Sequence, residues 1–166
     1  MKAFKIYWKA YGGFWALVKS PFFLVSLILT AVLIGIWLPI DDSGERMWAA
    51  LALSVLPSLI SFSLGALAIM FSMTSGTFLR ILHQDGDNNS LFMKTVATFF
   101  HFMLVQIIAL ILVLALEAYD TLLLSLLGFW AFAYSILCGL AAASNIVLLA
   151  DLKNKAAPLD NDLGPN

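Results

Sequence analysis

The side chains that could do chemistry inside the long apolar segments of this sequence are few and neutral. His101 and Gln106 lie in one such segment, and Asn145 lies in another. Helical rise places His101 about 10 Å from the nearer end of its segment, where a histidine either titrates and gates a pathway or stays neutral and hydrogen-bonded. Gln106 falls near the middle, at the depth of residues 58–61 and 134–135, and we expect it to form a hydrogen bond there.

The remaining reactive side chains exclude several classes of enzyme. Every Asp and Glu lies outside the apolar segments, whereas an intramembrane aspartyl peptidase or a proton-coupled exporter needs carboxylates within the membrane. Cys138 is the only cysteine, which excludes an internal disulfide and a CxxC redox pair. The segment from Asp85 starts like a calcium loop, but its sixth and twelfth positions are Ser90 and Val96 and not the glycine and glutamate required. We therefore expect no catalysis, no cofactor and no metal site.

The composition indicates where such a chain resides. Of its 166 residues, 62% are hydrophobic and 11% are charged. A soluble domain needs about 25% charged residues to cover its surface, so the composition predicts an integral membrane protein. The net charge of −1 argues against a nucleic-acid partner.

Four uncharged segments are each long enough to cross a bilayer, which takes about 20 helical residues. Because a lipid-exposed backbone must satisfy its own hydrogen bonds, they predict an all-α four-helix transmembrane bundle over residues 20–150. The expected helices lie at about 21–40, 47–74, 92–116 and 121–150. Ser20-Pro21 and Asp120-Thr121 are typical of helix starts.

The distribution of basic residues predicts the orientation. If both termini are cytoplasmic, eight of the nine lysines and arginines lie on the cytoplasmic side, and only Arg46 lies on the other. Cytoplasmic loops carry the excess of Lys and Arg, so we expect this topology in a bacterial inner membrane. Residues 151–166 are polar and contain two prolines, and they predict a flexible cytoplasmic tail that follows a short helical extension.

Residues 1–19 are expected to form an amphipathic helix in the plane of the inner leaflet. At 100° per residue, aromatic side chains gather on one face and the lysines fall on the opposite face. This arrangement is typical of contact with anionic lipid. The expected lipid-interface residues are Trp8, Tyr11 and Trp15. The helix serves either as a topology anchor or as a sensor on the membrane surface.

Two helices carry stripes of small residues with alternating spacings of three and four. The stripe on the second predicted helix is Ser54, Ser58, Ser61, Gly65, Ala68, Ser72 and Ser75, and the stripe on the fourth is Gly128, Ala131, Ser135, Cys138, Ala142 and Asn145. Small residues let helices approach closely within lipid. The stripes therefore pack inside one chain, or the first of them lines an oligomer axis or a narrow pore. Pro57 lies within that stripe and predicts a kink, which suits a gate or a fixed bend.

The long link between the second and third predicted helices offers a cytoplasmic surface. Its candidate partner-facing residues are Arg80, His83, Gln84, Asp85 and Asp87. Polar loops of this length tend to be functional, so the alternative of a membrane scaffold places the binding site for a cytosolic protein partner here, in the link at 80–94.

The arrangement as a whole resembles small bacterial membrane proteins of phage-exclusion and phage-defence systems, of the Rex and Kiwa types. The resemblance covers residues 50–116 best and includes a small-residue second helix that ends in Phe-Leu-Arg80 before a polar link. It implies ion leakage through a small homo-oligomer, or a membrane platform for a cytosolic partner. Both functions stay open at the level of the sequence: a conducting or membrane-perturbing oligomer, and a scaffold that conducts nothing.

Overall fold

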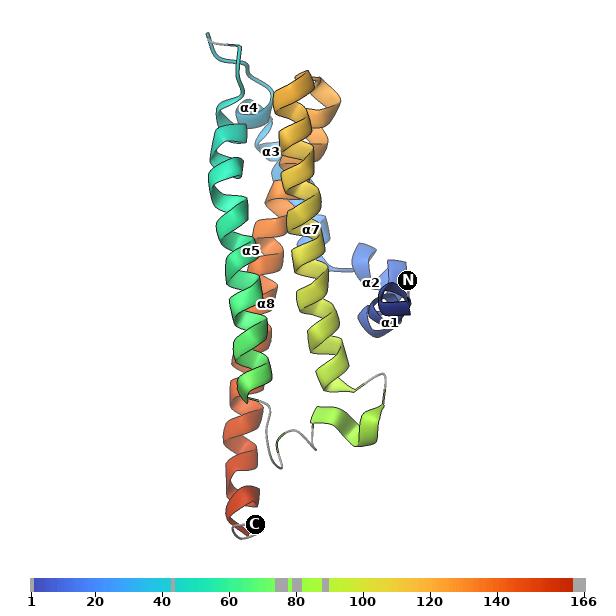
Figure 1. Ribbon diagram of the computed structural model, residues 1–166. Helices are drawn as coiled ribbons and strands as arrows, with labels where there is room; N and C mark the ends of the chain where they lie inside the picture. The colour runs from blue at the N-terminus through green and yellow to red at the C-terminus, as the bar shows by residue number, and fades with distance from the viewer. Residues whose placement is uncertain (1, 43, 74–77, 79–81, 88–89, 163–166) are drawn as a thin grey trace.

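The computed structural model describes residues 2–42, 44–73, 78, 82–87 and 90–162, and every regular element within them is helical, which confirms the all-α prediction. The elements are α1 (Lys2–Tyr11), α2 (Gly13–Val18), α3 (Pro21–Val32), α4 (Ile34–Trp37), α5 (Met47–Met73), the short 3-10 helix η1 (Gln84–Gly86), α7 (Leu91–Tyr119) and α8 (Leu122–Asp162). Figure 1 shows α5, α7 and α8 as long neighbouring helices, with α3 and α4 beside them toward one end and α1 and α2 to the side of α7.

Three of the helices are long and apolar enough to cross a membrane. They run over Met47–Ser72, Leu91–Tyr119 and Leu122–Pro158. The structure therefore has the composition and the helix lengths of a membrane protein, as expected from the sequence.

The first predicted transmembrane helix is shorter than expected and interrupted. α3 ends at Val32 and α4 ends at Trp37, short of the predicted end. Leu33 leaves helical geometry with φ −91° and ψ 28°, and the Trp37 indole donates to the Thr30 carbonyl at 2.7 Å. This side chain satisfies a backbone group near the break. Pro39 lacks the N–H that a longer helix would use, so the helix stops before it.

The N-terminal helix is divided by a pair of glycines. Gly12 and Gly13 have φ of 99° and 72°, a left-handed backbone that glycine adopts without steric cost. The chain therefore turns between α1 and α2, and the amphipathic helix expected over residues 1–19 is bent into two helices at the glycine pair, a position where the sequence already indicates a bend.

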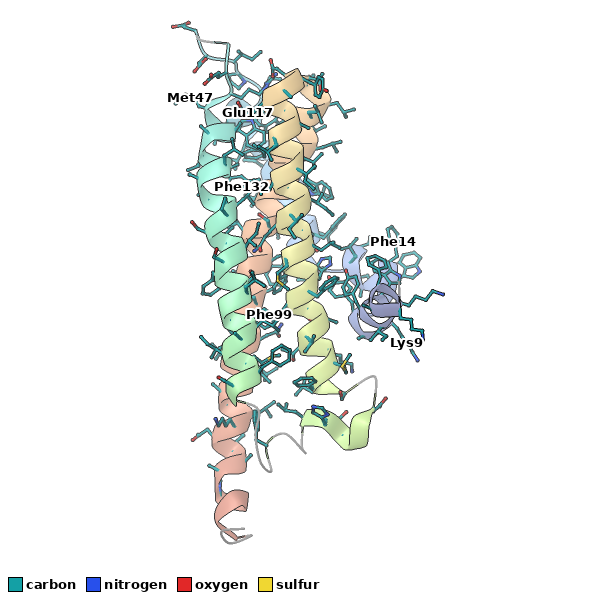
Figure 2. All side chains as sticks on the ribbon, viewed as in Figure 1. Lys9, Phe14, Met47, Phe99, Glu117 and Phe132 are labelled. Atoms are coloured by element: carbon teal, nitrogen blue, oxygen red, sulfur yellow. The ribbon has the colours of Figure 1, made fainter. Side chains whose placement is uncertain are left out.

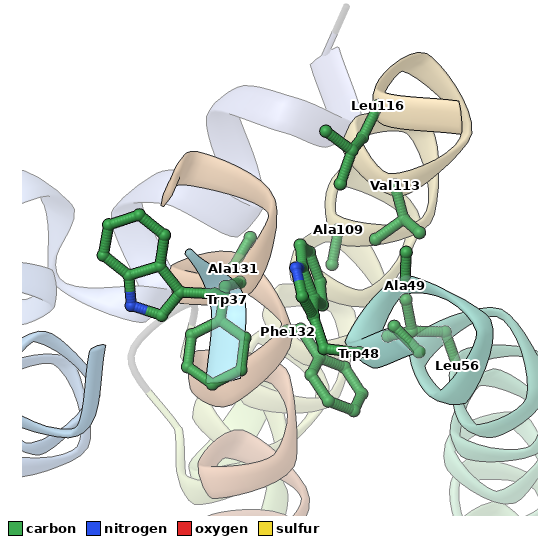
Figure 3. Packing of buried hydrophobic residues seen from close by; sticks show 11 residues of the cluster. Trp37, Trp48, Ala49, Leu56, Ala109, Val113, Leu116, Ala131 and Phe132 are labelled. Carbon is green, nitrogen blue, oxygen red and sulfur yellow. The ribbon is translucent and has the colours of Figure 1, made fainter. Parts of the chain in front are cut away.

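Close packing of rings against small residues builds the interior where α5, α7 and α8 meet (Figure 3). The buried Trp48 ring lies over Gly128, where an added Cβ would come within 3.1 Å of it. The Trp48 indole donates to Ser125 Oγ at 3.2 Å. Ala49 and Ala109 are fully buried, which lets α5 and α7 approach closely. These contacts join α5, α7 and α8 at this level of the bundle.

The last helix extends further into the C-terminal segment than the short helical extension expected from the sequence. α8 is continuous to Asp162, so most of the expected flexible tail at 151–166 is helical. Lys155 Nζ lies 2.7 Å from an Asp151 carboxylate oxygen, an i,i+4 pair that favours helix. Ala156 is buried against the link that precedes α7. The polar composition predicted flexibility because it does not reveal this contact.

Candidate functional site

A buried histidine joins three separate parts of the chain. The Tyr7 hydroxyl on α1 lies 2.8 Å from His101 Nδ1 on α7, and the Tyr134 hydroxyl on α8 lies 3.0 Å from Nε2. Each of the three side chains is at most 6% exposed. A neutral imidazole has one donor nitrogen and one acceptor nitrogen, so one tyrosine donates to the ring and the other accepts from it. The geometry suits a neutral, hydrogen-bonded His101 at the centre of a tyrosine–histidine cluster.

Tyr11, which the sequence predicted at the lipid interface, is half-buried and contributes its ring to this cluster. Its ring stacks on His101 with centroids 4.3 Å apart and planes at 23°. Burial raises the pKa of Tyr7 to about 12, helped by the nearby Tyr11. Burial also raises the pKa of Tyr11, although a hydrogen bond with Tyr134 partly opposes the shift. Both phenols on α1 therefore stay neutral at physiological pH.

The rest of the aromatic face on α1 and α2 is exposed. Trp8 is 36% exposed and Trp15 is 69% exposed, and the Lys19 ammonium lies 5.9 Å from the centroid of the Trp15 ring. Figure 2 shows Phe14 and Lys9 pointing away from the long helices. The predicted aromatic face is thus divided between docking onto α7 and exposure to the surroundings.

Gln106 connects α7 to α5 through a neighbour that the sequence missed. Gln106 is fully buried, and its Nε2 and Oε1 lie 3.1 Å and 3.2 Å from Ser63 Oγ. The expected partners Ser58 and Ser61 lie within about one and a half turns of Ser63, but α5 turns Ser58 and Ser61 outward and Ser63 inward. Helical depth was therefore predicted well, and the facing residue was not.

The small-residue stripe of α5 lies on the outside of the chain. The exposed residues are Ser54, Ser58, Ser61, Gly65, Ala68 and Ser72, and Ser75 lies outside the described residues. An added Cβ at Gly65 would meet nothing within 4 Å. Only 22% of the most apolar stretch of α5 is buried, compared with 44% in α7 and in α8. Packing within one chain, the first interpretation of this stripe, is therefore wrong for α5.

Several hydroxyls of this stripe bond to their own helix. Ser54, Ser61 and Ser72 donate to the carbonyls of Leu51, Pro57 and Ile69 at 2.8–3.0 Å. These bonds use the hydroxyl protons and leave the oxygen lone pairs to accept. Pro57 lies inside α5, which is helical throughout Met47–Met73. The face is small, weakly polar and free of formal charge.

The matching stripe of α8 is used inside the chain, in contrast to that of α5. Its buried members are Gly128, Ala131, Ser135, Cys138 and Ala142. Asn145, the last member, is half-buried. Two stripes with the same spacing thus have opposite locations, one interior and one exterior.

The link before α7 packs onto the C-terminal part of α8. Phe78 and Leu82 form a buried cluster with Ala156, and the His83 ring lies 4.5 Å from the ring of Phe92. This contact draws part of the predicted partner-facing surface toward the protein. Among the other predicted residues, Gln84 and Asp87 are exposed, Asp85 contributes its backbone to η1, and Arg80 lies outside the described residues.

At the opposite end of the bundle, Arg46 forms a clamp that sequence reasoning missed. Its Nε donates to an Asp120 carboxylate oxygen at 2.7 Å, and its NH1 donates to the carbonyls of Trp37 and Leu38 at 3.0 Å and 2.7 Å. The arginine is 7% exposed. It therefore ties the end of α4 to the link between α7 and α8. The available signal was one cation and several carboxylates in links predicted to lie on the same side.

These clusters are suited to hydrogen bonding and packing. Among the described residues no group of three or more His, Cys, Asp or Glu side chains is placed to hold a metal ion. Comparisons with protein-family models, with curated proteins and with solved structures gave no match for this chain.

Proposed function

We propose that the chain is a small protein of the bacterial inner membrane that forms a homo-oligomer with pore-like or membrane-perturbing activity, as an effector in phage defence. In this proposal α3 and α4 together make a short fourth span beside α5, α7 and α8, and both termini are cytoplasmic. The positive-inside bias supports that orientation. The exposed aromatic residues and lysines of α1 and α2 then contact the inner leaflet.

The outward stripe of α5 carries the proposal. Lipid tails are as apolar as leucine, so helices associate in a membrane through close packing of small residues and through hydrogen bonds. The stripe is exposed, Gly65 has open space beside it, and α5 is the least buried of the three long helices. A second copy of the chain that packs here brings α5 helices together at a common axis. No ring of charge lies on this face, so a pathway along it would be weakly selective.

Substitution of Gly65 tests assembly and activity together. Gly65→Leu places a large side chain on the stripe, and Gly139→Leu is the matched control because Gly139, on α8, also has no atom within 4 Å of an added Cβ. Mass measurement in mild detergent should give an oligomer for the wild-type protein and for Gly139→Leu, and smaller species for Gly65→Leu. The current across a planar bilayer should be similar for the wild-type protein and Gly139→Leu, and smaller for Gly65→Leu. A monomeric wild-type protein, or equal current from both variants, refutes the proposal.

A membrane scaffold is the second candidate function. The described part of the link supports it, because Phe78 and Leu82 pack against Ala156 and so hold that part of the link against α8. In this alternative the chain conducts nothing and recruits a cytosolic protein. Co-purification of a cytosolic protein that is lost on changing Asp85 and Asp87 together with Arg80, but retained on Lys153→Ala, supports the scaffold. Retention by all variants argues against this surface.

A further inference from the structure

A cavity of about 250 Å³ opens where the N-terminal helices meet the long helices. Its lining includes Tyr11 from α1, Ser20 from the start of α3, Thr98 from α7, and Tyr134 and Asn145 from α8. The cavity thus adjoins the tyrosine–histidine cluster on one side. Phe22 and Phe102 add apolar surface to the same lining.

The polar groups of this lining are uncharged, and two of them have spare hydrogen-bonding capacity. Among the residues that the structure describes, no hydrogen bond is formed by the side chains of Ser20 and Asn145. The Thr98 hydroxyl bonds only to the Lys94 carbonyl of its own helix. Among the described residues every fully buried side-chain polar atom has a partner, so the free donors of Ser20 and Asn145 are accessible groups in the lining of the cavity. The cavity therefore calls for a ligand that accepts hydrogen bonds and carries apolar groups.

The cavity lies at the depth where the bilayer changes from hydrocarbon to headgroup in the proposed topology. Ser20 joins the interfacial helix α2 to the start of α3. From Pro21 to Trp37 there are 17 residues, a rise of about 25 Å along a helix, which reaches most of the way across the hydrocarbon core of about 30 Å. Ser20 is then at the inner boundary. The ester-linked glycerol of a membrane lipid lies at that level.

We propose that this cavity binds the glycerol-ester region of one membrane glycerolipid. The proposal rests on the membrane location put forward above. Ester carbonyls are acceptors without donors, and the Ser20 hydroxyl and the Asn145 amide supply the donors they need. The side chains named for this lining carry no formal charge, so the cavity selects lipids by their ester linkage and not by the charge of the headgroup.

The test uses lipids that differ only in that linkage. Native mass spectrometry of the full-length protein, released from nanodiscs with equal amounts of diacyl and dialkyl-ether phosphatidylglycerol, should show one retained lipid with the diacyl form favoured by about tenfold, as expected for the loss of two hydrogen bonds. Diacyl phosphatidylethanolamine should be retained to the same extent as diacyl phosphatidylglycerol. Equal retention of diacyl and ether lipids overturns the proposal.

Variants locate the retained lipid and separate this proposal from the proposed function. Asn145→Leu should remove the ester preference, and Ser144→Leu, on the exposed side of the same helix, should keep it. Ser20→Ala gives a second test at the other end of the chain. If the wild-type protein resists alkaline extraction and forms an oligomer but Asn145→Leu retains the same lipid preference, the lipid site is wrong and the proposed function stands. If alkaline treatment extracts the wild-type protein from membranes, the membrane location is refuted, and with it both the proposed function and the lipid site.

Discussion

Removal of one hydroxyl group should release α1 from the long helices. In the structure, α1 docks on α7 through Tyr7 and Ala10, both 6% exposed, against Ala97. The Tyr7 hydroxyl is also a partner of His101 Nδ1 at 2.8 Å. Tyr7→Phe keeps the ring and leaves that nitrogen buried and unpaired, which costs about 1–3 kcal/mol. Because α1 packs mainly on α7 and this bond joins the two helices, the cost should appear as local opening of α1.

The size of the effect sets the assay. A cost of about 1–3 kcal/mol corresponds to roughly 5- to 150-fold faster hydrogen exchange of the α1 amides, measured by mass spectrometry in detergent micelles. Tyr119→Phe is the matched control, because it deletes the same hydroxyl from a residue that is 75% exposed, and it should leave exchange unchanged within about twofold. Unchanged exchange in Tyr7→Phe, or an equal change in both variants, would show that the hydroxyl does not hold α1.

Three further perturbations have outcomes that follow from the same contacts. The pKa of Tyr7 is raised to about 12 in the folded protein from an ordinary value of about 10, so the docked form with a neutral Tyr7 is favoured fully below about pH 10 and this contribution is lost as the pH rises through 12. Docking of α1 should weaken over that range, which exchange kinetics or Trp fluorescence can follow. Tyr7→Phe should reduce this transition to the part that comes from Tyr11, whose pKa burial also raises. Gly128→Ala should destabilise the protein by about 1–3 kcal/mol in an SDS titration, since its Cβ would crowd Trp48 at 3.1 Å, whereas Gly139→Ala should not. Arg46→Met should lower the free energy of unfolding in an SDS titration by about 2 kcal/mol, because two helix-end carbonyls and a carboxylate lose their donor. An unchanged titration curve contradicts the clamp.

The sequence predicted which residues share a face much better than it predicted what that face meets. The stripes of α5 and α8 were both read correctly as faces from their spacing, yet one is exposed and the other is buried. Spacing defines an angle around a helix, while the neighbour at that angle depends on how the other helices pack. Ser63 shows the same limit, because it bonds to Gln106 only through the rotation of α5 toward α7.

Only part of the tyrosine–histidine cluster could be predicted from the sequence, for a similar reason. His101 stood out as a polar residue in an apolar segment, but Tyr7 and Tyr11 belonged to a helix whose amphipathic pattern assigned all its aromatic residues to lipid. Amphipathicity reports that a face is apolar and not whether lipid or protein covers it. The break at Leu33 had a local signal that was not used, since Gly35 and its β-branched neighbours favour helix weakly, whereas the Trp37 indole that bonds near the break comes from the next turn and could not be predicted.

The length of α8 gives the protein a mechanical property. Its 41 residues make a rod of about 60 Å, twice the hydrocarbon thickness of about 30 Å. In the proposed topology roughly half of the rod projects beyond the bilayer. Ala156 in this half is buried against the link that precedes α7, so that link moves together with the rod. A tilt of about 5° within the membrane then moves the free end by about 3 Å, from the rise per residue. Rearrangement of helices inside the lipid is thereby converted into displacement on the cytoplasmic side.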